Sequence, residues 1–351
     1  MTKRFAGFLL ALCLICPPAL AKNPTALFYL MGTQKSTHSF LANIDKIDVL
    51  VPTWYGVDGT GLVSGEADEY VYSAARAKQL SITPILSMSA GRAGFHALLH
   101  DESAKQRMNT WLVREGKARG YKGFQFDFES IVWTDRDAYT LMVKQTADAL
   151  HKAGMTLSVA VVPNAPGYSQ GGDFAKWMWQ YWRGPYDLKA LGQAADLISL
   201  MTYDQHTRWT TPGPVDGMPW ILKQLDYALT QVPRQKLSLG IAAYGYRWYT
   251  GNPVKEDGTE ASNISATYID ADESFPLAVE QHATVQWDPV EQESWFYFYR
   301  DDMREWVFRP DARSFRARYD LVKQRGLEGF SCWVLGAEDP KVWDELPLAE
   351  R

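Results

Sequence analysis

The fold class of this chain follows from one short run of sequence, Leu157-Ser-Val-Ala-Val-Val162. The run is apolar at almost every position, whereas a strand with one solvated face alternates apolar and polar residues. Continuous apolar character is typical of a parallel strand that is buried on both faces. The run therefore favours an α/β architecture, in which helices cover both sides of a parallel sheet.

Seven other β-prone runs accompany this one, and most begin 30 to 42 residues after the one before. That spacing leaves room for one helix and two loops between successive strands. Strand–helix alternation repeated eight times predicts a (β/α)8 TIM barrel. The eight runs are 25–32, 47–55, 81–89, 123–130, 155–163, 195–204, 236–246 and 329–334.

Helical patterns fill the intervals between these runs. From Pro219 to Val232, apolar residues recur at a helical period and form one stripe. A second such stripe follows Pro310, with Phe315 and Tyr319 on one face, and Gly326 is placed to end the helix. Both segments therefore read as barrel helices.

The last interval is longer than the others, because the seventh and eighth runs begin 329 − 236 = 93 residues apart. The excess lies between about Trp248 and Pro310. It contains two β-like pieces, 266–270 and 294–299, and a helical stretch at 275–281. We expect a small α+β insertion here that forms one wall of a cleft on the catalytic face.

Composition narrows the classes of ligand. The formal net charge is −5 without a long charged run, so a nucleic-acid partner is not expected. Aromatic residues make up 13% of the chain, which suggests a groove for a flat neutral ligand with apolar faces. The sequence points to no cofactor and no metal, and we expect a monomer.

The first 21 residues have the pattern of a cleavable secretory signal. Lys3 and Arg4 precede an apolar run, and Ala19-Leu-Ala21 forms a small-residue cleavage site before Lys22. An uncleaved membrane anchor is the alternative, but no other segment reaches 18 apolar residues. We therefore expect a secreted or periplasmic protein of residues 22–351, with a net charge of −5 − 2 = −7 and Cys332 as its only cysteine.

The fourth predicted strand, Gly123-Phe-Gln-Phe-Asp-Phe-Glu-Ser130, carries the chemistry. Alternation places Gln125, Asp127 and Glu129 on the face opposite the three phenylalanines. Barrel active sites lie at the carboxyl ends of strands, so both acids would face the barrel mouth. Two carboxylates roughly 6 to 7 Å apart on one strand raise the pKa of at least one of them. A general acid at neutral pH requires such a shift, whereas a purely structural polar network is the alternative.

Together with two later motifs, this strand resembles glycoside hydrolase family 18, the chitinase-like enzymes. The family's strand reads Asp-Gly-x-Asp-x-Asp-x-Glu, and this chain retains Gly123, Asp127 and Glu129. The family's Met-x-Tyr-Asp pattern corresponds to 201–204, and its eighth-strand tryptophan to Trp333. Pro212-Gly-Pro214 and Pro219-Trp220 are similar to a subgroup of spore-cortex-lytic and related cell-wall enzymes.

The resemblance implies a retaining, substrate-assisted glycosidase, for which the two-carboxylate scheme does not hold. Glu129 would protonate the glycosidic oxygen, Asp127 would orient the acetamido group of the sugar, and Tyr203 would bind its carbonyl oxygen. The polymer would contain N-acetylglucosamine, with peptidoglycan as the first choice and chitin as the second. The residues expected to bind substrate are Trp333, Met201, Asp204, Gln125, Tyr29, Trp54 and Tyr244.

Two positions depart from the family pattern. Lys122 replaces the outermost Asp, and Gln125 replaces the middle one. Gln125 can only form hydrogen bonds, so Asp127 loses a like-charged neighbour and the pH dependence of catalysis can differ. A catalytically silent carbohydrate-binding barrel is the rival interpretation, although the acid is retained here at Glu129.

Three other signals are weaker. The segment 167–171 matches the Gly-x-Ser-x-Gly pattern of serine hydrolases, but it lacks a strand directly before it and a helix directly after it. His96 and His100 have the i, i+4 spacing of a helical metal pair, yet no third ligand is evident in the sequence, so surface histidines are the default. The aromatic cluster Trp177, Trp179 and Trp182 could line the cleft or pack a loop.

Overall fold

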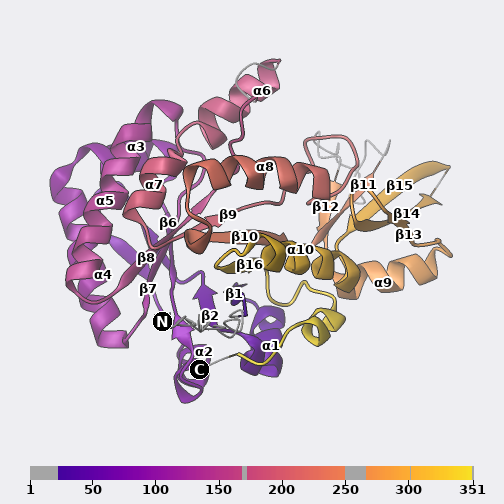
Figure 1. Cartoon of the computed structure of the whole chain (residues 1–351), viewed down its shortest axis with the longest axis horizontal. Coiled ribbons are helices and arrows are strands. Elements are labelled where there is room, and N and C mark those ends of the chain that lie inside the picture. The colour runs from indigo at the N-terminus through magenta and orange to yellow at the C-terminus, as the bar shows by residue number, and fades with distance from the viewer. Residues whose placement is uncertain (1–22, 168–171, 250–265, 301, 350–351) are drawn as a thin grey trace, which may run out of the picture.

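The computed structural model describes residues 23–167, 172–249, 266–300 and 302–349. Each of the eight predicted runs contains at least one strand of the main sheet (Figure 1). The strands of this sheet are β1 (Thr25–Leu30), β2 (Val49–Pro52), β3 (Tyr55–Val57), β4 (Val63–Gly65), β5 (Ser81–Ile82), β6 (Ile85–Met88), β7 (Gly123–Asp127), β8 (Thr156–Val161), β9 (Leu197–Leu200), β10 (Leu237–Ala242) and β16 (Gly329–Trp333).

The sheet closes into a barrel, as the strand spacing predicts. Its order is β4-β3-β6-β7-β8-β9-β10-β16-β1-β2-β5, and all pairs except β3·β4 are parallel. β2 and β3 are the two halves of one run, and so are β5 and β6. β3 pairs with β6 near one end of this order, and β2 pairs with β5 at the other end. The same two runs therefore lie at both ends, which closes the sheet into a barrel.

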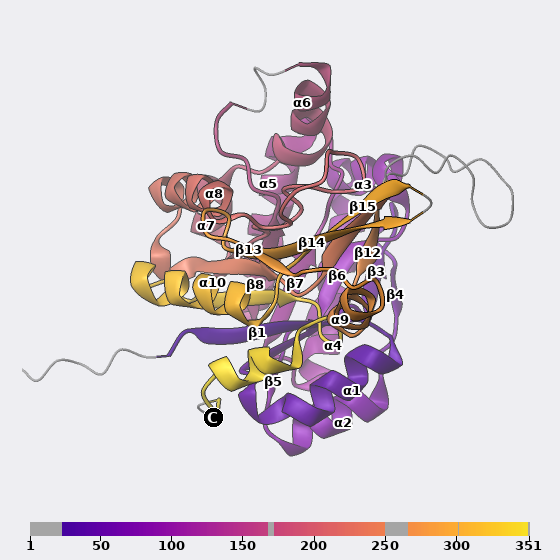
Figure 2. The same ribbon diagram turned by 90° about the vertical axis from the view of Figure 1, so that its right-hand side faces the viewer.

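Helices cover the outside of this barrel (Figures 1 and 2). Two of them match the predicted apolar stripes, and Gly326 ends the second in the left-handed conformation at φ 60°. The helices, with short ones labelled η, are α1 (Gln34–Asn43), η1 (Ile44–Lys46), α2 (Glu69–Ala77), α3 (Gly91–His100), α4 (Glu102–Arg119), η2 (Trp133–Asp135), α5 (Arg136–Lys152), α6 (Asp173–Met178), η4 (Trp179–Arg183), α7 (Leu188–Ala194), α8 (Met218–Gln231), η5 (Arg234–Lys236), α10 (Ala312–Arg325) and η6 (Pro340–Glu345).

The predicted insertion is present as a second, antiparallel sheet of order β12-β11-β15-β14-β13 with one helix. It leaves the barrel directly after β10, at the carboxyl end of that strand (Figure 1). The sheet includes residues just before Trp248, so it begins earlier than expected. Its elements are β11 (Gly245–Tyr249), β12 (Ala266–Ile269), α9 (Ala271–Glu280), β13 (Gln286–Asp288), β14 (Glu293–Arg300) and β15 (Met303–Arg309).

The alternation predicted for β7 is confirmed by its packing. Phe124, Phe126 and Phe128 are fully buried in the core between strands and helices. The Phe128 ring lies 4.6 Å from that of Phe95 on α3 and 6.3 Å from that of Tyr139 on α5. The phenylalanine face therefore anchors the strand to the helical layer, and the polar face is left for the barrel interior.

The predicted signal segment and the Gly-x-Ser-x-Gly serine lie outside the described residues. Within the described part of the chain, no helix combines the length and apolarity needed to cross a membrane. Cys332 is buried and carries a free thiol. Burial raises the pKa of this thiol well above its usual range, which fits a packing role rather than a reactive one.

A buried charge cluster joins the insertion to the barrel. The guanidinium of Arg318 on α10 is fully buried and lies 2.8 Å from Asp216 and 3.9 Å from Glu293 on β14. It also donates hydrogen bonds to the backbone carbonyls of Gln292 and Asp216. One cation thus holds a barrel helix, the loop before α8 and the first residue of an insertion strand.

Replacing Arg318 with Ala is expected to lower the free energy of unfolding by about 3 to 5 kcal/mol, because two buried carboxyl groups lose their cation. Urea unfolding followed by circular dichroism measures this loss. Arg316→Ala is the matched control on the same helix, since its ion pairs are largely exposed and should contribute less than about 1 kcal/mol. Equal losses in the two variants would contradict a structural role for the cluster.

Candidate active site

The polar face of β7 points into the barrel and begins with a fully buried amide. The Gln125 side chain donates a hydrogen bond to the hydroxyl of Tyr29 on β1 and accepts one from Ser158 on β8 at 3.1 Å. Both ends of the amide are therefore occupied by neighbouring strands. Gln125 lies in the interior network below the carboxylates and connects three strands there.

Asp127 and Glu129 follow on the same face, at the carboxyl end of β7. Both are partly exposed at the barrel mouth and yet enclosed by protein on most sides, so desolvation dominates their titration. It raises the pKa of Asp127 to about 6. Desolvation, with the charges of Asp127 and Asp204, raises the pKa of Glu129 to about 8. This is the shift that the strand pattern predicts, and Glu129 is the group that stays protonated at neutral pH.

The backbone is strained next to this acid. Ser130, directly after Glu129, has φ 58°, a value that L-residues seldom adopt. Arg92 at the start of α3 donates hydrogen bonds to the carbonyl and hydroxyl oxygens of Ser130, at 3.0 and 2.7 Å. These contacts hold the turn that follows the acid.

The loop after β9 brings the family's second motif to the same place. Asp204 has φ 59° and accepts hydrogen bonds from the hydroxyls of Tyr244, at 2.6 Å, and Tyr246, at 3.2 Å. Its charge raises the pKa of Glu129, so the carboxyl group lies on the catalytic side. The pKa of Tyr203 is itself raised, by burial first and then by charges that include Asp127 and Glu129. Met201 is buried at the foot of this loop.

Close approach of β10 is needed to position Tyr203. A Cβ on Gly240 would stand 2.5 Å from the carbonyl oxygen of Leu200 and 2.9 Å from the Tyr203 ring. Only glycine leaves that space, which explains its place in the sequence at this point of the strand. The hydroxyl of Thr202 also donates a 2.7 Å hydrogen bond to the Gly240 carbonyl.

Trp333 is the last residue of β16. Its indole lies 5.1 Å from the ring of Tyr29, at 56°. Both belong to a small apolar cluster inside the barrel that also contains Val51 and Ile85. The tryptophan is therefore at the carboxyl end of the eighth strand with its ring on the interior side, where it can support a flat ligand.

One predicted substrate residue has a different position. The Trp54 ring contacts the rings of Tyr55 and Tyr121, at 6.5 and 6.2 Å, and packs against the core between strands and helices. The other nine predicted site residues lie at or inside the mouth of the barrel, in the elements described above. The position of Trp54 differs from the prediction because the chain bends between β2 and β3. The sequence predicts one continuous strand over 47–55 and does not show this bend.

Several residues that the sequence did not single out support this site. The Tyr186 hydroxyl donates a 2.7 Å hydrogen bond to the carbonyl of Phe128, between the two acids. Desolvation raises the pKa of Asp204, and the positive charge of Arg183, itself buried, partly opposes that rise. Both residues belong to the segment after β8, whose sequence shows neither the period of a strand nor that of a helix. Their roles could be found only from tertiary contacts.

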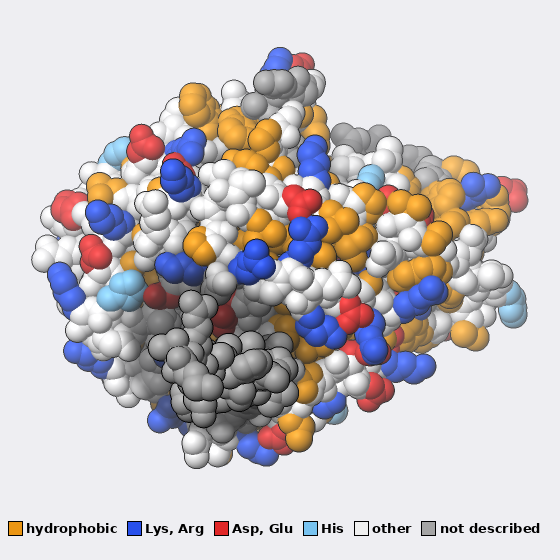
Figure 3. Space-filling view, in the orientation of Figure 1, with side chains coloured by type: hydrophobic (Ala, Val, Ile, Leu, Met, Phe, Trp, Pro, Cys, Tyr) orange, Lys and Arg blue, Asp and Glu red, His pale blue; other side chains and the backbone are white. Residues whose placement is uncertain are grey.

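Aromatic side chains continue outward from the site over the insertion. The Tyr246 ring stacks on that of Tyr268 at 4.7 Å, and Tyr268 is 59% exposed. Figure 3 shows hydrophobic side chains gathered over the insertion and below α6. At α6 and η4, Trp177 is exposed and contacts Phe174, Tyr181 and Trp182, so part of the tryptophan cluster faces solvent.

The fold agrees with comparisons to known proteins. Residues 26–338 match the family model described as "Glycosyl hydrolases family 18". The chain belongs to glycosyl hydrolase family 18.

Individual proteins of similar sequence or structure match this chain at modest identity. The chain is 30% identical over 247 residues to the cortical fragment-lytic enzyme of Bacillus subtilis, which covers 70% of this chain and 54% of the relative. It thus spans about half the length of that relative. The spore cortex-lytic enzyme of Bacillus megaterium superposes with a TM-score of 0.81 at 23% identity, covering 96% and 77% of the two chains. A chitinase from Chromobacterium violaceum gives 0.80 at 25% identity, covering 92% and 97%.

Proposed function

We propose that this protein hydrolyses β-linked N-acetylglucosaminides in peptidoglycan, with retention and with the acetamido group of the substrate as the nucleophile. The observation that carries the proposal is one oxygen of Asp127. Its Oδ1 is buried and has no hydrogen-bond partner among the described residues. A buried acceptor without a partner costs free energy, so a donor from the substrate would be strongly favoured there.

The acetamido N–H of an N-acetylglucosamine unit is a suitable donor. When it is held by Asp127, its carbonyl oxygen is directed at the anomeric carbon, which supplies the orientation that an intramolecular attack requires. The nearby negative charge also stabilises the positive charge that develops on the cyclised ring. Tyr203, on the neighbouring loop, is the donor for the carbonyl oxygen.

Glu129 supplies the proton for the leaving group. Its raised pKa keeps the carboxyl group protonated at neutral pH, so it can protonate the glycosidic oxygen as the bond breaks. The resulting carboxylate then removes a proton from water, which opens the cyclic intermediate and restores the acid. No protein nucleophile is needed in this sequence of steps.

Peptidoglycan is the first choice of polymer because two of the similar proteins are named for the spore cortex. Chitin is the second choice, supported by the structural likeness to a chitinase. Export through the predicted signal would place the enzyme with such a wall polymer. Mass spectrometry of the mature protein should find a start near Lys22, and a soluble cytoplasmic form that retains residues 1–21 would overturn this part.

Digestion of purified peptidoglycan and of chitin, followed by mass and reducing-end analysis, tests the substrate class. The proposal requires soluble fragments that end in reducing N-acetylglucosamine, more rapidly from peptidoglycan. NMR should show the β-anomer of the product first, and initial release of the α-anomer would contradict retention. Binding of both polymers without turnover would favour the silent carbohydrate-binding barrel.

The pH dependence of kcat/KM is expected to be bell-shaped. Activity should fall as the pH rises through the raised pKa of Glu129, because the general acid loses its proton. It should also fall at low pH as Asp127, whose pKa is raised as well, becomes protonated and no longer accepts from the acetamido group. Initial rates on a soluble aryl chitooligoside measure both limbs. A flat profile of kcat/KM from pH 5 to 9 would contradict the roles of Glu129 as general acid and Asp127 as acceptor.

A further inference from the structure

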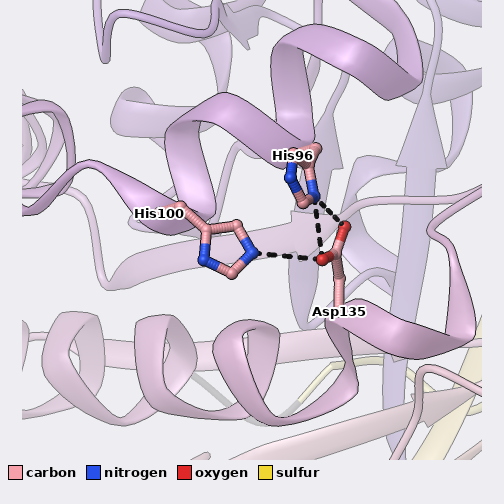
Figure 4. A group of neighbouring side chains, drawn as sticks. All are labelled: His96, His100 and Asp135. Atoms are coloured by element: carbon pink, nitrogen blue, oxygen red, sulfur yellow. Dashed lines mark hydrogen bonds and ion pairs between the residues drawn. The ribbon is translucent and has the colours of Figure 1, made fainter.

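A second group of chemically reactive side chains lies outside the catalytic mouth, on the surface of the barrel. His96 and His100 are on α3, one turn apart, and both are more than half exposed. Their rings lie 4.5 Å apart and point toward the carboxyl group of Asp135, at the end of η2 (Figure 4). The sequence offered the two histidines without a third ligand, and the fold supplies it.

The Asp135 carboxyl group is the feature that suggests a ligand. Its side chain is only 4% exposed, and its partners among the described residues are the two imidazoles. His96 Nδ1 is 2.9 Å from both oxygens, and His100 Nε2 is 3.2 Å from Oδ1. A carboxylate buried to this degree is normally paired with a cation or coordinated to a metal ion.

Neighbouring cations have other partners. Arg136, next in sequence to Asp135, pairs with Asp187 at 2.9 Å. Arg92, one turn before His96, donates its hydrogen bonds to Ser130 and lies over the ring of Tyr181. Among the described residues, no Lys or Arg side chain is thus paired with this carboxyl group. A metal ion that binds here would not have to displace a basic side chain from it.

We propose that His96, His100 and Asp135 form a binding site for a divalent transition-metal ion of the Zn²⁺ type. One donor atom from each residue can be chosen so that all three lie within 4.8 Å of one another. Tetrahedral coordination with bonds of about 2.0 to 2.1 Å places ligand atoms about 3.3 Å apart, so small side-chain shifts would suffice. Two imidazoles and one carboxylate suit Zn²⁺, and the exposed side of the histidines leaves a fourth position for water.

Metal binding would change the role of one ring nitrogen in each histidine. Without metal, that nitrogen can donate an N–H to the carboxylate. With metal, the same nitrogen offers its lone pair, and the proton sits on the other ring nitrogen.

The location gives the site a structural consequence. Asp135 is six residues after Glu129, and α3 also holds the turn between them through Arg92 on Ser130 and Phe95 on Phe128. A metal bridging α3 and η2 would add a third tie across this turn. The site is therefore independent of the proposed substrate, but it is coupled to the stability of the segment that carries the acid.

Titration of the full chain with Zn²⁺ by calorimetry, after removal of metal with a chelator, tests the proposal. We expect one saturable site per chain and a rise in Tm of about 3 °C or more at 100-fold excess over Kd. Co²⁺ should give visible absorption bands of a low-coordinate site. H96Q, H100Q and D135N should each weaken binding by more than the roughly 10- to 100-fold that loss of an outer partner costs.

His151→Gln is the matched control, since His151 contacts a single carboxylate, Asp196, at 2.8 Å. It should leave Zn²⁺ affinity unchanged. The two exposed histidine variants should fold normally, as circular dichroism can check, so the test does not depend on the buried Asp135. Absence of saturable binding, or one-to-one binding that survives H96Q and H100Q together, would overturn the assignment.

Discussion

The Glu129→Gln variant is expected to lose at least about 10²- to 10⁴-fold in kcat, the usual contribution of a general acid. Gln has the same shape but no proton of suitable acidity, so the leaving sugar would depart as an alkoxide. Substrate affinity should be nearly unchanged, because the amide can still form hydrogen bonds. Steady-state initial rates measure kcat. Calorimetric binding of an oligosaccharide that is not hydrolysed measures substrate affinity separately.

Stability serves as the control for this variant. The folded protein raises the pKa of Glu129, so the native state keeps a proton that the unfolded state releases as the pH rises. The wild-type protein therefore loses stability as the pH rises from about 4.5 to about 8, and Glu129→Gln should lose less over this interval. If Glu129→Gln loses less stability over this pH range and yet keeps near wild-type turnover, the general acid is another residue.

The Asp127→Asn variant should lose nearly as much activity as the loss of the acid. The amide can present a donor where the acetamido N–H needs an acceptor, and it carries no charge to stabilise the cyclised intermediate. The loss should appear in kcat rather than in KM, because the contact strengthens as the acetamido group attacks. Kinetics on an aryl N-acetyl-chitooligoside provide both parameters.

A second signature separates this role from simple misfolding. The charge of Asp127 is one cause of the raised pKa of Glu129, so residual activity of Asp127→Asn should have its alkaline limb at lower pH. A thiazoline analogue of the cyclised sugar should also bind the variant less tightly than the wild type. An unshifted limb with full affinity for the analogue would place Asp127 outside the reaction.

The barrel could be predicted because its signals are local. Eight apolar runs at near-regular spacing and two helical stripes suffice to indicate strands, helices and their order. The split of two runs into β2–β3 and β5–β6 could not be predicted from apolar character. The breaks follow Pro52 and contain Pro84, residues that remove a backbone donor from the ladder.

The site was predictable where chemistry follows the period of one strand. Alternation along β7 is enough to place Gln125, Asp127 and Glu129 on one face. Arg183 and Asp135 could not be found in this way, since their partners are 21 and at least 35 residues away in sequence. Trp54 shows the converse limit: an aromatic residue at a strand end can turn toward the helices when the strand bends.

The buried Arg318 cluster also bears on how the molecule melts. An appended sheet joined to a barrel only by exposed contacts would lose its structure at its own temperature, and a calorimeter would record two peaks. Here the cation of α10 is shared with Asp216 in the barrel and Glu293 in the insertion. Opening either part leaves charges of the other without their counterion in a dry interior. The two sheets should therefore behave as one cooperative unit, with calorimetric and van't Hoff enthalpies that agree.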